Sequence, residues 1–114
     1  MLTIYTDGAA RGNPGPGGAG VVISFPDGRR RRLSRPLGHT TNNRAELLAV
    51  RLALDAVVAH HEMPIEIYTD SQNVIGWLTG VYRVHSNAEL ISELWTTLEP
   101  VSYTHLTLPT NREV

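Results

Sequence analysis

Two aspartates, Asp7 and Asp70, end the same tetrapeptide, Ile-Tyr-Thr-Asp, which occurs at residues 4–7 and again at residues 67–70. Each copy has the apolar–polar alternation of a strand, with the aspartate on the same face as the tyrosine two residues before it. If the two strands are parallel neighbours, both carboxylates emerge at the edge where open α/β sheets bind ligands. Two carboxylates held close together repel each other unless a proton or a cation intervenes. The pattern therefore favours a divalent metal with oxygen ligands.

Each aspartate also has an ordinary structural interpretation. Asp70 could be the N-cap of a short helix that begins at Ser71, and Asp7 could form an Asx turn before Gly8. Either local role is plausible for one residue alone. Because both aspartates occur on matched tetrapeptides, we favour the metal-binding interpretation.

A third acid, Glu46, lies in the first turn of the longest predicted helix, Asn43–His60. Its helical neighbours are alanine and valine, so Glu46 lies beside the buried face, where a carboxylate must be paired or bind a metal. The alternative is a capping box in which Asn43 is the N-cap and Glu46 follows three residues later. The preceding amides of Asn42 and Asn43 support a functional interpretation, because amides are good donors to nucleic-acid backbones and bases.

Alternation, turn residues and helical stripes together predict an α/β domain. Residues 43–60 can form a right-handed crossover helix, which lets the strand at 65–70 return parallel to the first strand. The predicted strands are Leu2–Asp7, Ala19–Phe25, Arg29–Leu37 and Ile65–Asp70, and the two further predicted helices are Ser71–Thr79 and Ser86–Leu98.

The stretch Gly8–Gly18 is rich in glycine and proline and is predicted to be a loop. Its backbone amides could cradle a phosphate, although no Gly-Lys-Ser/Thr follows as in a nucleoside-triphosphate loop. The alternative is a tight connection between two antiparallel strands.

Composition restricts the class of protein but does not identify it. The chain has 114 residues, enough for one domain, with 41% hydrophobic residues, no cysteine and a net charge of −1. It shows no signal peptide and no apolar run approaching the ~18 residues of a membrane span, so we expect a cytoplasmic monomer without membrane contact. All ten basic residues are arginine, and five of them fall within residues 29–35. That cluster could contact phosphate or could simply protect an exposed edge strand.

Three motifs in order resemble type 1 ribonuclease H: TDGAARGNPGPGGAG, TTNNRAEL and YTDSQNV. The resemblance covers roughly residues 2–98. It implies a mixed five-stranded sheet with strand order 3-2-1-4-5, flanked by helices. It also implies metal-dependent endonucleolytic cleavage of the RNA strand of an RNA–DNA hybrid, leaving a 5′-phosphate and a 3′-hydroxyl.

The same resemblance assigns roles to individual residues. Asp7 would bridge two Mg²⁺ or Mn²⁺ ions, with Glu46 and Asp70 as further ligands and catalytic residues. Recognition of the RNA strand would go through its 2′-hydroxyls. The residues expected to touch the hybrid's minor groove and sugars are Gly8, Asn13, Asn42, Asn43 and Gln72.

The chain also departs from this family. No aspartate follows Asp70 to act as the family's fourth metal ligand, and His105 lacks the context of the family's flexible histidine loop. We interpret residues 1–100 as the ribonuclease H domain, with its last strand and closing helix incomplete. Residues 101–114 could supply a short fifth strand, but we favour an adapter-derived tail.

We therefore expect the chain as written to be poorly active. Two other functions are compatible with the motifs. One is a module that binds hybrid without cutting it, and the other is a recombinase or reverse-transcriptase type of nuclease domain with the same fold.

Overall fold

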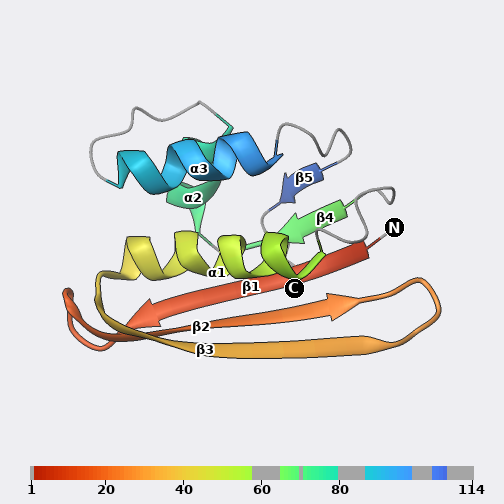
Figure 1. The fold of residues 1–114 in the computed structure, drawn as a ribbon, viewed down its shortest axis with the longest axis horizontal. Coiled ribbons are helices and arrows are strands. Elements are labelled where there is room, and N and C mark those ends of the chain that lie inside the picture. The colour runs from red at the N-terminus through yellow and green to blue at the C-terminus, as the bar shows by residue number, and fades with distance from the viewer. Residues whose placement is uncertain (1, 58–64, 70, 80–86, 99–103, 108–114) are drawn as a thin grey trace.

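The computed structural model of the chain describes residues 2–57, 65–69, 71–79, 87–98 and 104–107 (Figure 1). Within these residues, five strands and three helices form an α/β domain. In chain order they are β1 (Leu2–Ala10), β2 (Gly15–Ser24), β3 (Arg30–Thr40), α1 (Asn42–Val57), β4 (Ile65–Tyr68), α2 (Gln72–Leu78), α3 (Ala88–Leu98) and β5 (Thr104–Thr107).

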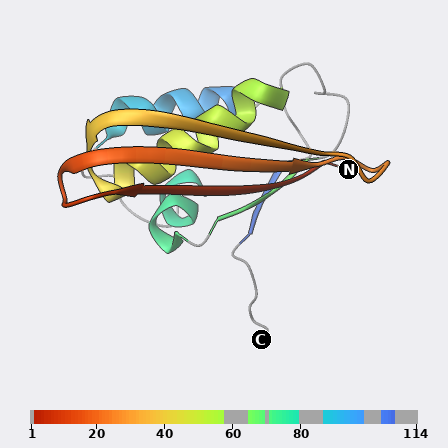
Figure 2. The same ribbon diagram turned by 90° about the horizontal axis from the view of Figure 1, so that it is seen from below.

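The strands form one mixed sheet in the order β3-β2-β1-β4-β5, which confirms the predicted order. The first three strands are an antiparallel meander, whereas β1, β4 and β5 run parallel to one another. Between β1 and β4 the chain passes through α1, which lies against β1 and β2. Figure 2 shows α1 and α3 on the same side of the sheet.

The alternation predicted for the first strand is correct. Leu2, Ile4 and Thr6 are buried beneath the helices, whereas Tyr5 and Asp7 on the opposite face are exposed. The other strands and the helices add the rest of the core, mainly Val21, Ile23, Ile65, Ile67, Leu47, Val50, Leu54, Leu90, Ile91 and Leu94. Burial of this apolar surface holds the helices on one face and leaves Asp7 on the other.

The prediction of a loop over Gly8–Gly18 is wrong. Strand β1 continues to Ala10 and β2 starts at Gly15, so the glycine-rich sequence is mostly extended hairpin. Only residues 11–14 connect the strands, and Gly12 supplies the left-handed conformation there with φ of 82°. The alternative interpretation, a tight connection between antiparallel strands, is the correct one.

The described residues after α3 are Thr104–Thr107, which form β5 and pair in parallel register with Ile65–Tyr68. These four residues belong to the tail that we interpreted as adapter-derived, and their position matches the alternative of a short fifth strand. None of the described helices is long and apolar enough to cross a membrane.

Candidate metal and nucleic-acid site

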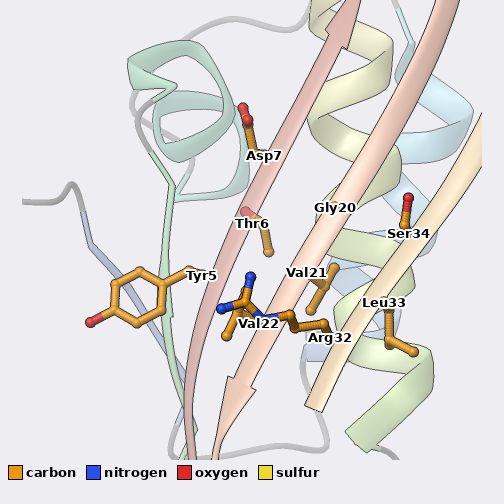
Figure 3. A pocket seen from close by; sticks show the side chains of 9 residues that line it. All are labelled: Tyr5, Thr6, Asp7, Gly20, Val21, Val22, Arg32, Leu33 and Ser34. Carbon is orange, nitrogen blue, oxygen red and sulfur yellow. The ribbon is translucent and has the colours of Figure 1, made fainter. Parts of the chain in front are cut away.

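Asp7 lies near the end of β1 with its side chain exposed on the face opposite α1. Its cross-strand neighbours are Gly20 on β2 and, beyond it, Ser34 on β3. Because Gly20 has no side chain and serine is small, an open hollow of about 340 Å³ lies beside Asp7 (Figure 3). Since β1 continues three residues beyond Asp7, the alternative role of an Asx turn before Gly8 is wrong.

Glu46 is half-buried on α1, one turn from the helix start. The helix begins at Asn42, and the Thr41 hydroxyl accepts a hydrogen bond from the backbone N–H of Arg44 at 3.2 Å. Thr41 therefore caps α1, and Asn43 lies inside the helix. The capping-box interpretation of Asn43 and Glu46 is wrong, so capping does not account for this acid.

Gly8 brings the two acidic segments together. A Cβ built on Gly8 would collide with the backbone carbonyl of Ala45 and would lie 2.6 Å from the backbone nitrogen of Glu46. Only glycine allows β1 to approach α1 so closely. The residue that follows Asp7 therefore touches the backbone of Glu46, which places the two acid-bearing segments against each other.

The second tetrapeptide runs beside the first, as predicted. Parallel register pairs Ile4 with Ile67 and Tyr5 with Tyr68. A hydrogen bond from the Tyr68 hydroxyl to Glu66, 2.7 Å long, raises the pKa of that phenol, because the carboxylate stabilises its protonated form.

Asp70 itself lies outside the described residues. The N-cap of α2 is Ser71, whose hydroxyl accepts from the backbone N–H of Val74 at 3.1 Å. The alternative role of Asp70 as that cap is therefore wrong. Among the described residues, no three acidic or histidine side chains gather closely enough to hold a metal ion.

The predicted amide contacts divide into two groups. Asn13 and Asn42 join the hairpin turn to the start of α1 through their side-chain oxygens. Asn43 instead faces α2, where its side-chain oxygen lies 3.5 Å from the amide nitrogen of Asn73. Gln72 is the exposed first residue of α2. These hydrogen bonds connect the hairpin turn with the start of α1, and the start of α1 with α2.

Sequence reasoning missed two side-chain contacts near the start of α1. Asn73 contacts Asn43, and Arg44 donates to the side-chain oxygen of Asn87 at 3.2 Å, which connects the start of α1 with the start of α3. Asn87 has φ of 57°, a left-handed conformation that asparagine tolerates better than most residues. No local sequence pattern predicts these pairs, because their members are 30 and 43 positions apart.

A mixed sheet ordered β3-β2-β1-β4-β5, with acids on β1 and on the crossover helix, defines the ribonuclease H-like class of α/β folds. The family model for RNase H matches residues 1–106. This chain belongs to the ribonuclease H family.

Individual relatives agree with this assignment. A ribonuclease H of Bradyrhizobium sp. (strain ORS 278) is 40% identical over 113 residues, which cover 88% of this chain and 71% of the relative. Another, from Bradyrhizobium diazoefficiens, is 44% identical over 87 residues, covering 73% of this chain and 54% of the relative.

Solved structures give the same result. LC11-RNase H1, solved in complex with an RNA/DNA hybrid, superposes with a TM-score of 0.84 at 34% identity, covering 95% of this chain and 84% of that one. RNase H1 from the halophilic archaeon Halobacterium salinarum gives a TM-score of 0.77 at 33% identity, over 94% of this chain and 83% of that one.

Proposed function

We propose that this chain is an endonuclease that hydrolyses the RNA strand of RNA–DNA hybrids with two divalent metal ions, Mg²⁺ or Mn²⁺. Asp7, Glu46 and Asp70 would hold the ions. The contact between Gly8 and the Glu46 backbone carries the proposal, because it joins the two acid-bearing segments of the described chain. Asp70 follows Tyr68 by two residues, as Asp7 follows Tyr5, and the two tyrosines are register partners.

The carboxylates of Asp7 and Glu46 are oxygen ligands of the kind that hard divalent cations prefer. Asp7 is exposed and Glu46 half-buried, so both carboxylates can reach an ion without a large cost of desolvation. Two bound ions would supply an activated water and stabilisation of the leaving 3′-oxygen. Asp7 would serve both ions, as the resemblance to ribonuclease H implies, so its loss should be the most damaging.

Substrate recognition is proposed for the groups around the acids. Asn43 and Gln72 would offer their side-chain amides to the hybrid, and Asn13 and Asn42 would present the NH₂ groups that their hydrogen bonds turn away from the backbone. Such donors suit ribose hydroxyl and phosphate oxygens, which distinguish and position an RNA strand. The hybrid bound by LC11-RNase H1 supports this choice of substrate.

A cleavage assay on a labelled RNA–DNA hybrid tests the proposal. Because the family's fourth aspartate is missing, we expect the wild-type chain to cut RNA slowly, and only with Mg²⁺ or Mn²⁺ present, leaving 5′-phosphate ends. Asp7→Asn should reduce the rate at least ~100-fold, since loss of ~2.7 kcal/mol of transition-state stabilisation has that effect.

Asp55→Asn is the matched control, because Asp55 is an exposed acid that forms an ion pair with Arg51 on the same helix. Its activity should equal that of the wild type. Tight hybrid binding without turnover would instead support the non-catalytic binding module, and equal cleavage of duplex DNA would support a nuclease of another specificity.

A further inference from the structure

Two side-chain amides connect the β1–β2 turn to α1 through consecutive hydrogen bonds. The Asn42 side-chain oxygen accepts from the backbone N–H of Ala10 at 2.8 Å, and the Asn13 side-chain oxygen accepts from the backbone N–H of Asn42 at 2.9 Å. We call this pair of bonds the amide clamp. A backbone N–H can only donate, so the oxygen of each amide must face the clamp and its NH₂ group must face elsewhere.

The clamp satisfies donors that the secondary structure leaves without partners. The first N–H groups of a helix have no intrahelical acceptor, and Asn42 is the first residue of α1. Ala10 is the last residue of β1, and its N–H donates to the side-chain oxygen of Asn42 on α1. The clamp therefore joins the end of one element to the beginning of the other.

The clamp and the acids lie on the same two short segments. On β1, Ala10 follows Asp7 by three residues, and on α1, Glu46 follows Asn42 by four, about one helical turn. Between these pairs, Gly8 touches the Glu46 backbone. A shift of α1 that lengthened the clamp bonds would also separate Gly8 from Glu46, and with it the two carboxylates.

We infer that Asn42 and Asn13 are positioning residues that fix the separation of the Asp7 and Glu46 carboxylates. This inference rests on the proposed function in taking those carboxylates as metal ligands. It also orients the clamp amides: each oxygen is turned toward the backbone N–H that it accepts from, so the NH₂ group is the part turned away from the clamp. Those donors suit acceptors such as ribose or phosphate oxygens.

Two substitutions at residue 42 separate positioning from substrate contact. Asn42→Asp keeps an acceptor oxygen for the Ala10 N–H but removes the NH₂ donor. Asn42→Ala removes both. Ile91→Val in α3 is the control for a modest loss of core packing, because Ile91 is fully buried and lies in a different element from the clamp.

Binding of Mn²⁺ by calorimetry and steady-state cleavage of hybrid report on the site. Asn42→Ala should weaken Mn²⁺ binding about tenfold, the lower end of the range for residues that orient metal ligands, and should lower kcat. Asn42→Asp should restore Mn²⁺ affinity and kcat to within about twofold of wild type, while KM for hybrid remains raised by the lost donor and the added charge. Ile91→Val should leave the Mn²⁺ affinity, kcat and KM for hybrid unchanged.

Amide hydrogen exchange, measured by NMR without metal, reports on the clamp directly. The Ala10 amide should be protected in the wild type and in Asn42→Asp, and unprotected in Asn42→Ala. The Gly8 and Glu46 amide resonances should shift only in Asn42→Ala.

The two proposals can fail separately. A wild-type chain that neither binds Mn²⁺ nor cuts hybrid contradicts the proposed function. In that case, hydrogen exchange and resonance shifts of the metal-free protein still test whether the clamp positions Gly8 and Glu46. Equal loss of metal affinity in Asn42→Asp and Asn42→Ala, or unchanged Gly8 and Glu46 resonances in Asn42→Ala, would overturn the positioning role.

Discussion

The ring of Tyr5 stacks on that of Tyr68, with centroids 5.1 Å apart and an interplanar angle of 23°. This pair shows that the repeated tetrapeptides lie side by side in matching register, because each tyrosine occupies the same position in its own copy. Tyr5 is 48% exposed, so the pair marks the face of the sheet that also carries Asp7. Both aspartates follow their tyrosines by two residues in the sequence.

Gly8→Ala should damage both the fold and the metal site. The new Cβ would press on the carbonyl of Ala45 and the nitrogen of Glu46, and backbone atoms of a helix cannot move aside cheaply. We expect a loss of ~1–3 kcal/mol in the free energy of unfolding, typical of overpacking, together with weaker Mn²⁺ binding. Gly18→Ala is the control, since a Cβ there would meet nothing closer than 3.8 Å. Urea unfolding and calorimetry measure both effects, and equal behaviour of the two variants would contradict the close approach.

Metal should stabilise the folded chain through the acids. A ligand that binds only the folded state raises the free energy of unfolding by RT ln(1 + [L]/Kd), which is ~2.7 kcal/mol at a hundredfold excess over Kd. The wild-type Tm should therefore rise with Mn²⁺ and return to its starting value with chelator. Asp7→Asn should show no rise, because it lacks an ionised ligand. A Tm that increases equally in both proteins would place the metal elsewhere.

Asn43 and Gln72 should contribute to hybrid binding more than to stability. Asn43 is not the helix cap, and Gln72 is exposed on α2, so replacing either by alanine should change the Tm little. Hybrid affinity, measured by fluorescence anisotropy with Ca²⁺ in place of Mg²⁺, should fall several-fold. Thr41→Ala provides the contrast, since loss of this cap should lower stability by ~1 kcal/mol. Unchanged affinity in both amide variants would refute their assignment to the substrate.

Removal of residues 101–114 should lower the stability of the chain. Strand β5 pairs with the outer edge of β4, so its loss would leave that edge without a partner among the described elements. We expect a lower urea midpoint for the shortened chain. If the midpoint and the hybrid cleavage rate are unchanged, the tail makes no contribution to the fold, as the adapter interpretation predicts.

The sequence by itself determined which elements form and which faces they bury. Alternation of apolar and polar residues in β1 and β4 is a local property, and burial follows it directly: Ile4 and Ile67 are buried and Tyr5 is exposed. The repeated tetrapeptide also predicted the neighbouring parallel strands, because a crossover helix between two such strands leaves few other topologies.

Tertiary structure decided how the glycine-rich segment and the start of α1 are arranged. The sequence TTNN offers four residues that can cap a helix, and local propensity did not distinguish Thr41 from Asn43. Asn42 lies in the helix because its oxygen and its N–H find partners in the hairpin, 32 and 29 positions away. The glycines of the hairpin extend as strands for a similar reason, since pairing between β1 and β2 overrides their preference for turns.

The asparagines show most clearly that residue type alone does not determine what a side chain contacts. Motif resemblance grouped Asn13, Asn42 and Asn43 as substrate contacts, yet the first two also hold the acid-bearing segments together. Identical side chains can donate to a ligand or accept from a backbone, and residue type does not distinguish the two uses. Only the position of distant N–H groups determines which atom of each amide is turned toward the backbone and which is turned away.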